Sequence, residues 1–253
     1  MRGWLAWLAR QGSIQMSVQG QTVQPDRVVL VCGTGTEVGK TWVAARLLAA
    51  LRTGGLTVAA RKPAQSFDID GRGDALGGAT DAEVLGVASG EHPDVVCRPS
   101  RSYHRAMAPP IAAAALGLAS FTVADLVGEL QWPDAGTDVG LVEMAGGVRS
   151  PQADDGDVCD FVHLLRPDLV ILVADAGLGT INSIRLCMDA LAGSTVEAED
   201  VSTVVVLNRY DGDHEIHRRN RDWLAERCLY SIVTLPGEER LLADLVAGLV
   251  AGS

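Results

Sequence analysis

The sequence predicts an α/β protein with a mostly parallel sheet of about six or seven strands and helices on both faces. Two observations lead to this fold class. Short runs of β-branched residues alternate with longer helical segments from Arg27 onward, which is the pattern of strand–helix–strand units. The runs are apolar at almost every position, as expected for strands that are buried on both sides.

The expected strands are rich in valine, isoleucine and threonine, which suit a pleated and buried surface. In chain order they cover 28–32, 57–61, 139–143, 169–174, 203–207 and 230–234, with a seventh, weaker candidate near 95–97. The expected helices cover 41–52, 81–89, 109–117, 123–131, 157–165, 181–192, 215–227 and 238–250. Several follow residues that favour a helix N-cap, among them Thr80, Thr122 and Asp213.

Composition limits the domain organisation and the partners. Of 253 residues, 47% are hydrophobic, so residues 26–253 can form one domain with a large core. Residues 1–25 differ in character, and Arg10 interrupts their brief apolar stretch, so they are expected to form a flexible extension and no membrane span. A net charge of −11 argues against nucleic-acid and membrane partners. Five scattered cysteines fit the reduced thiols of a cytoplasmic protein.

The strand Val28–Cys32 runs directly into the glycine-rich stretch Gly33-Thr-Gly-Thr-Glu-Val-Gly-Lys-Thr41, and a helical segment follows. This is the order of elements in a P-loop NTPase, in which backbone N–H groups of the loop bind phosphates. Lys40 adds a positive charge for the phosphates, and the Thr41 hydroxyl can ligate Mg²⁺. The loop has five residues between Gly33 and Gly39, where the generic motif has four. The sequence therefore predicts a site for a nucleoside triphosphate.

Polar residues follow the other strands, where ligands of parallel sheets gather. Lys62 and Ser66 follow the second strand, and Glu143 ends the third. A carboxylate on an apolar strand is costly unless it is paired or bound to a metal, which indicates Mg²⁺ at Glu143. Asp81 is either a further ligand or an ordinary first-turn carboxylate that the helix dipole favours.

Two later turns also carry candidate ligand groups. The small-residue turn that begins at Asp175 leads through Asn182 into a helix, which makes a second potential anion site. Asn208 ends the fifth strand and could read a base edge. Asp211 has the spacing of a guanine-reading carboxylate relative to Asn208, but turn chemistry alone explains it and is the favoured interpretation.

Taken in order, these motifs resemble the dethiobiotin synthetase family. They are Gly-Thr-x-Thr-Glu-Val-Gly-Lys-Thr, Lys-Pro-x-x-Ser, Thr-Asp-Ala, Met-Ala-Pro-Pro, Glu-x-Ala-Gly-Gly, Leu-Gly-Thr-Ile-Asn and a strand-ending Asn, between Val28 and Leu235. The resemblance implies a homodimeric ligase that closes the ring of dethiobiotin from 7,8-diaminononanoate and CO₂, through a carbamate and a carbamic-phosphoric anhydride. It implies Mg²⁺ and a nucleotide, with ATP as the expected one and GTP and CTP as alternatives.

The resemblance also assigns roles to residues. For the nucleotide they are Gly35, Glu37, Val38, Gly39, Lys40, Thr41 and Asn208, and for the metal Thr41, Asp81 and Glu143. Thr36, Lys62 and Ser66 would surround the carbamate and act with Lys40 in catalysis. The diamine would contact Ser66, Ala145, Gly146 and Gly147, and its carboxylate would bind Gly179, Thr180, Ile181 and Asn182 of the partner subunit.

The sequence departs from the family at two positions. Met144 stands where many members have glycine, and we expect its side chain to crowd the substrate or to shift the backbone. Gly35 stands where many have aspartate, which matters less for the expected chemistry.

Three other functions share this architecture. A switch ATPase of the ParA/MinD class usually carries an additional lysine early in the phosphate loop, and residues 33–36 contain none. A cobyrinate or cobyrate amide synthase needs a glutamine-hydrolysing domain, for which there is no room after residue 235. A related ligase could act on another substrate. His214 and His217 lack a third ligand nearby and are interpreted as a solvent-facing pair.

Overall fold

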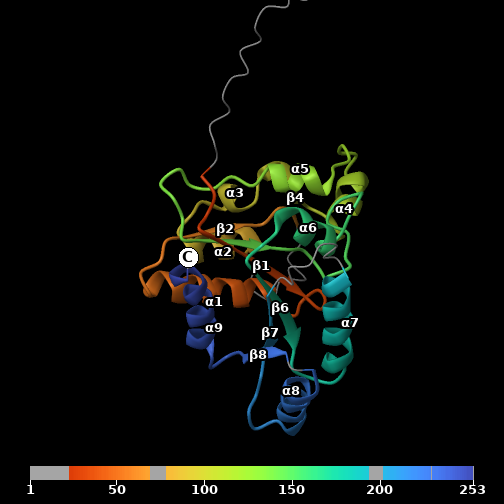
Figure 1. The fold of residues 1–253 in the computed structure, drawn as a ribbon. Helices are drawn as coiled ribbons and strands as arrows, with labels where there is room; N and C mark the ends of the chain where they lie inside the picture. Colours follow the sequence, from red (N-terminus) through yellow and green to blue (C-terminus); the bar gives the residue numbers. More distant parts are fainter. Residues whose placement is uncertain (1–22, 69–77, 194–201, 229, 253) are drawn as a thin grey trace, which may run out of the picture.

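The computed structural model of the protein describes residues 23–68, 78–193, 202–228 and 230–252. Within these ranges, six strands form one sheet in the order β2–β5–β1–β6–β7–β8, and every neighbouring pair is parallel (Figure 1). The strands are β1 (Arg27–Gly33), β2 (Val58–Arg61), β5 (Val139–Glu143), β6 (Leu169–Asp175), β7 (Thr203–Asn208) and β8 (Ser231–Thr234). The predicted α/β class is confirmed. The N-terminal extension expected over residues 1–25 falls almost entirely outside the described ranges.

Helices cover both faces of the sheet, and the strand side chains alternate between two cores. Along β1, Leu30 and Cys32 belong to one core, while Val29 and Val31 belong to the other. This is the consequence of successive strand residues pointing to opposite faces. The first core includes residues of α4 (Pro109–Ala115), α5 (Val123–Gly128), α6 (Val158–Leu165), α7 (Thr180–Gly193) and α8 (Glu215–Cys228). The second includes residues of α1 (Lys40–Thr53), α2 (Asp81–Ser89), α3 (Pro93–Val96) and α9 (Glu239–Ala251).

Local capping explains where several helices begin. The Thr80 side chain accepts a hydrogen bond from the backbone N–H of Glu83, and the Glu83 carboxylate accepts one from the backbone N–H of Thr80. This reciprocal pair satisfies two groups that a helix start leaves unpaired. Thr122 and Asp125 form the same arrangement at α5. Thr80 and Thr122 are therefore confirmed as caps.

The expected strand near residues 95–97 is wrong. This segment lies in the short helix α3, in which Pro93 occupies the first turn and the His92 side chain accepts a hydrogen bond from the N–H of Asp94. Proline favours the first turn of a helix because the missing N–H has no partner there in any case. A second, two-stranded sheet pairs β3 (Gln65–Ser66) with β4 (Ser102–Tyr103), next to the 3₁₀ turn Pro99–Arg101, and was not predicted.

The helix expected over 123–131 ends earlier, at Gly128, and Trp132, four residues later, is buried in the core. That indole is 6% exposed and lies against Gly140 of β5. A β-carbon at position 140 would lie 2.7 Å from the indole ring, so a larger residue there would push the tryptophan out of the core.

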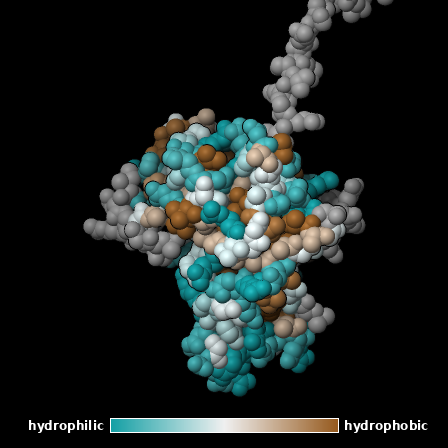
Figure 2. All heavy atoms as spheres, turned by 90° about the vertical axis from the view of Figure 1, so that its left-hand side faces the viewer, coloured by the Kyte–Doolittle hydropathy of each residue, from teal (hydrophilic) through white to brown (hydrophobic). Residues whose placement is uncertain are grey.

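Within the described ranges, the helices are all too short or too polar to cross a bilayer. Figure 2 shows one face of the molecule, on which hydrophobic residues form separate groups in the upper and middle parts, while the lower part is mostly hydrophilic.

Met144 does not occupy the position that we expected from the sequence. Its side chain is 0% exposed and belongs to the core cluster that contains Leu30 and Val142. Its backbone N–H donates to the carbonyl of Val31 at 2.9 Å, which continues the pairing of β5 with β1. The strand alternation therefore turns the side chain into the core, away from the residues that follow Glu143 in the loop. The expectation that Met144 crowds a substrate is wrong.

This placement predicts a stability effect. Truncation of Met144 to Ala should lower the free energy of unfolding by roughly 2–5 kcal/mol because it leaves a cavity. The volume-conserving change Met144→Leu should cost less than about 1.5 kcal/mol. Urea unfolding followed by circular dichroism measures both values. Equal stability of the Ala variant and the wild type would contradict this placement of the side chain.

Candidate active site

The phosphate loop connects β1 to α1 with a conformation that only glycine tolerates at position 39. Gly39 has a φ of 89°, and a β-carbon there would lie 2.1 Å from Nδ2 of Asn208. Glu37 also has a positive φ, of 62°, which is uncommon for a residue with a side chain. The ammonium group of Lys40 donates to the carbonyl of Gly35 at 2.8 Å and so lies over the loop. The loop and its lysine are arranged as a phosphate-binding turn requires.

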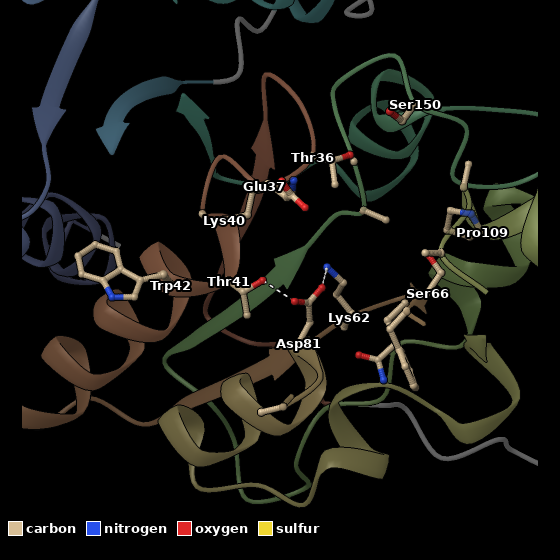
Figure 3. A pocket seen from close by; sticks show the side chains of 18 of the residues that line it. Thr36, Glu37, Lys40, Thr41, Trp42, Lys62, Ser66, Asp81, Pro109 and Ser150 are labelled. Atoms are coloured by element: carbon tan, nitrogen blue, oxygen red, sulfur yellow. Dashed lines mark hydrogen bonds and ion pairs between the residues drawn. The ribbon is translucent and has the colours of Figure 1, made fainter. Parts of the chain in front are cut away.

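The second group of site residues comes from three different elements. Lys62 follows β2, Asp81 begins α2 and Glu143 ends β5. The ammonium group of Lys62 lies 2.7 Å from Oδ2 of Asp81 and 2.6 Å from Oε1 of Glu143. The Thr41 hydroxyl, at the start of α1, lies 2.7 Å from Oδ1 of Asp81 and 2.8 Å from Oε1 of Glu143. Figure 3 shows Thr41, Asp81 and Lys62 converging in one cleft.

The charged side chains of this group shift one another's pKa values. Burial by itself would lower the pKa of Lys62, but the carboxylates of Asp81 and Glu143 outweigh it and raise that pKa. Burial raises the pKa of Glu143, against the opposing effect of Lys62. The pKa of Asp81 is lowered, because Lys62 and the Thr41 hydroxyl outweigh the effect of burial. Burial and the charge of Lys62 lower the pKa of Lys40 to about 8. Lys62 therefore remains a cation at neutral pH.

The oxygen atoms of this group fit a magnesium ion. Glu143 is 0% exposed, yet its Oε2 has no hydrogen-bond partner among the residues that the structure describes. A buried carboxylate oxygen without a partner is costly and indicates a missing ligand. Mg²⁺ prefers one or two carboxylates and keeps water or phosphate oxygens as its other ligands. Thr41, Asp81 and Glu143 offer two carboxylates and one hydroxyl, which match this preference.

A cleft of about 680 Å³ joins these groups. Of the predicted site residues, those that line it are Thr36, Glu37, Gly39, Lys40, Thr41, Lys62, Ser66, Asp81, Ala145, Gly146 and Asn208. Gly35, Val38 and Glu143 lie directly behind this lining, where the first two accept hydrogen bonds through their carbonyl groups from Lys40 and Asn208. The structure therefore brings most of the predicted residues together.

The loop after β5 is held by its own side chains. Gln152 accepts from the N–H of Ala145 and donates to its carbonyl, and the Ser150 hydroxyl accepts from the N–H of Gly147. Gly147 lies against the phosphate loop rather than in the cleft, since a β-carbon there would lie 3.3 Å from the carbonyl oxygen of Thr34. Ala145 and Gly146 remain at the cleft wall.

The strand β7 ends against the phosphate loop. The amide group of Asn208 donates to the carbonyl of Val38 at 2.9 Å, and the guanidinium of Arg209 donates to the carbonyl of Glu37 at 2.7 Å. Asp211 lies outside the cleft lining, where its carboxylate accepts from the N–H of Asp213 at 2.8 Å. The interpretation of Asp211 as a turn residue agrees with this hydrogen bond.

Residues 179–182 do not reach the cleft of their own chain. They form the start of α7, where Gly179 has a φ of 90° and Thr180 is 6% exposed. The Thr180 hydroxyl is buried without a hydrogen-bond partner within the described ranges, and Asn182 is exposed. A single chain therefore leaves the predicted carboxylate site separate from the rest.

Several residues of the cleft wall were missed from the sequence. They include Trp42, Gln65, Phe67, Asp68, Ala106–Pro109, Ser150, Arg209 and Pro236. One signal was available: the sequence contains only two lysines, Lys40 and Lys62, and both line this cleft. All other basic side chains apart from histidine are arginines. A residue type confined to two positions can thus indicate a site by its rarity.

Comparison with known proteins agrees with this geometry. The family model AAA_26, described as an AAA domain, matches residues 27–234. The ATP-dependent dethiobiotin synthetase of Corynebacterium efficiens is 36% identical over 170 residues, which are 67% of this chain and 72% of that protein. The enzyme of the same name from Haloferax mediterranei is 34% identical over 210 residues, 81% of this chain and 82% of that protein.

Among solved structures, a plasmid partition protein of Borrelia burgdorferi bound to AMPPNP has a TM-score of 0.51. The match covers 90% of this chain and 99% of that chain at 11% identity, so it shows a shared fold alone. The matches to the synthetases show more than a shared fold, because the identity is much higher and the alignments cover two thirds or more of both sequences. The chain belongs to the family of the ATP-dependent dethiobiotin synthetases.

Proposed function

We propose that this chain closes the ureido ring of dethiobiotin from 7,8-diaminononanoate and CO₂ in the cytoplasm, with ATP as the phosphoryl donor and Mg²⁺ as the metal. As a family member, it is an enzyme of the cyclo-ligase type that acts in biotin biosynthesis. The observation that carries the proposal is the meeting of Lys40 and Thr41 with the Lys62–Asp81–Glu143 group in one cleft.

The proposed reaction has three steps. An amine of the substrate attacks CO₂ and loses a proton, which gives a carbamate. A carbamate oxygen attacks the γ-phosphorus of ATP, ADP leaves, and a carbamic-phosphoric anhydride forms. The second amine attacks the anhydride carbon, loses a proton and expels phosphate, which closes the ring. The last step is intramolecular, so correct positioning alone accelerates it strongly.

The protein must overcome repulsion between two anions in the second step. The carbamate and the phosphate carry charges of the same sign, and cations must bring them together and stabilise the transferring charge. Lys40 lies over the phosphate loop, and Lys62 lies toward Ser66 and the rest of the cleft. Because its two carboxylate partners keep Lys62 protonated, it can serve as a permanent cation for the carbamate.

Thr41, Asp81 and Glu143 would hold the metal, which when bound neutralises charge on the phosphates. The carboxylates also explain why two lysines can lie close together. The ammonium group of Lys62 lowers the pKa of Lys40, and the negative charges of Asp81 and Glu143 oppose this effect. The acidic pair therefore has two functions in the proposal: it binds the metal and it compensates the cations.

For the nucleotide, Asn208 supports ATP. Its amino group is occupied by Val38, which fixes the orientation of the side chain and leaves Oδ1 as the acceptor. An acceptor suits the exocyclic amine of adenine, whereas guanine presents a carbonyl in the corresponding place. Asp211, the carboxylate that would read guanine, is engaged in its own turn and does not line the cleft.

We also propose a homodimer, in which the start of α7 of the partner subunit completes each site. In one chain, residues 179–182 do not line the cleft. Large apolar side chains beside them are exposed, with Leu178 at 92% and Leu186 at 61%. A partner subunit that covers these side chains would remove them from water.

The direct test of the proposed reaction is product detection. Protein, 7,8-diaminononanoate, bicarbonate and MgATP should yield dethiobiotin in mass spectrometry, and EDTA should abolish the product. A parallel sample without the diamine serves as the control. ATP hydrolysis at the same rate with and without diamine, and no dethiobiotin, would contradict the proposal and favour a switch ATPase.

A second prediction concerns Lys62, and Arg61 offers a matched control. Both are buried cations in ion pairs, Arg61 with Glu91 at 2.8 Å, but Arg61 does not line the cleft. Lys62→Ala should cost about 3–5 kcal/mol of stability because it leaves the buried carboxylate of Glu143 without its cation. Arg61→Ala should also cost stability because it leaves the partly buried Glu91 without its cation. Lys62→Ala should in addition lower kcat about a hundredfold or more, whereas Arg61→Ala should not. The assay is made at a temperature at which both variants are folded by circular dichroism. Equal kcat values would rule out the role proposed for Lys62.

The third prediction tests the shared site by complementation. Asn182→Ala should raise the KM for the diamine with little change in nucleotide affinity. Lys62→Ala damages the cleft, so a mixed dimer of the two variants contains one site with both parts intact. Mixing the variants under conditions that allow subunit exchange should recover activity at low diamine concentration. Absence of recovery, or a fully active monomer in light scattering, would refute the shared site.

A further inference from the structure

The cleft has two distinct ends. Figure 3 places Trp42 at one end and Ser66 with Pro109 at the other, with Thr41, Asp81 and Lys62 between them. The proposed function puts the phosphates at Lys40 and Thr41 and the carbamate at Lys62 and Ser66. The base of the nucleotide must then extend away from Ser66, toward Trp42.

The indole of Trp42 is held in place from its own helix. Trp42 follows Thr41 on α1 and is half-buried at the cleft wall. One turn later, the guanidinium of Arg46 lies over the indole, with its carbon 5.5 Å from the ring centroid. Arg46 in turn lies 3.4 Å from the carboxylate of Glu239 on α9. The ring therefore has a fixed position between two helices, as a stacking surface requires.

Two polar side chains of the cleft wall, those of Asn208 and Arg209, are already engaged with the protein. The amino group of Asn208 donates to Val38, and the guanidinium of Arg209 contacts Glu37 and Asp175. Among the described residues of the cleft wall, Trp42 is the one tryptophan. Its flat, apolar ring is suited to the face of a nucleobase, which has the same shape in every nucleotide.

We propose that the indole of Trp42 stacks against the nucleobase and strengthens the binding of ATP, GTP and CTP by a similar factor. Stacking on an aromatic side chain tolerates any base, because each base offers a π face. The ranking of the nucleotides is then left to hydrogen-bonding groups such as Asn208. The inference rests on the proposed function for the direction of the nucleotide in the cleft.

The test measures nucleotide binding without the diamine. Calorimetric titration gives the Kd of MgATP, MgGTP, MgCTP and, as a ligand without a base, magnesium tripolyphosphate. Trp42→Leu keeps an apolar side chain and removes the ring. Its Kd for all three nucleotides should rise about tenfold, the effect of losing one stacked base, while its Kd for tripolyphosphate should not change.

Trp223 provides the matched control. It is a partly exposed tryptophan on α8, 38% exposed, with the guanidinium of Arg185 at 5.9 Å from its ring, and it does not line the cleft. Trp223→Leu should leave all four Kd values unchanged. Unchanged nucleotide Kd values in Trp42→Leu would overturn the inference, and so would equal weakening of tripolyphosphate, because the ring would then act through the phosphate loop.

A second variant covers the case in which Trp42→Leu does not fold. Trp42→Phe keeps a smaller ring, so it should retain affinity within about threefold and lose most of the change in tryptophan fluorescence that nucleotides cause. An unchanged fluorescence response would overturn the inference. Nucleotide binding that depends on Trp42, without formation of dethiobiotin, would refute the proposed reaction and leave the stacking intact.

Discussion

The buried contact between Lys62 and Glu143 is the interaction on which the rest of the site depends. Glu143 is fully buried at the end of β5 and Lys62 follows β2, its neighbour in the sheet. Because an isolated buried ion is very costly, Glu143 depends on Lys62 as its cation, whereas Lys62 is paired with Asp81 as well. The parallel pairing of the two strands places both residues at the same edge of the sheet. The pairing of β2 with β5 and the charge compensation between Lys62 and Glu143 therefore depend on each other.

The sheet order extends this arrangement to the phosphate loop. β1 lies between β5 and β6, so the loop after β1 is next to the end of β5 on one side. On the other side, Asn208 at the end of β7 reaches the loop and occupies the space that a side chain at position 39 would need. Position 39 thus requires glycine for two reasons: the left-handed backbone of the turn, and the close approach of Asn208. A ligand in the cleft therefore contacts a phosphate loop that lies next to β5 on one side and is held by Asn208 on the other.

The sequence was informative about this edge of the sheet because the strands are buried on both faces and the site residues directly follow them. The apolar runs around Val31, Leu141 and Ile171 strongly favour an interpretation as buried strands. The predictions from the sequence were wrong where tertiary packing determines the local structure. Met144 continues the alternation of β5 for one more residue, which family comparison alone does not reveal, and the short helix at Pro93 has too few residues for a periodic pattern. Trp42 was missed because a tryptophan on an apolar helix is usually part of a core.

The distribution of lysines gives this protein an unusual chemical property. Arginine supplies every other strong cation of the chain, and guanidinium groups do not react with electrophiles that attack amines under mild conditions. Apart from the chain terminus, the primary amines are those of Lys40 and Lys62, of which Lys62 is locked as an ammonium by two carboxylates. Lys40, with its lowered pKa, is the more nucleophilic of the two. Among the side-chain amines, Lys40 at the phosphate site is therefore the one that cyanate and activated esters would modify, and a bound nucleotide would shield it from them.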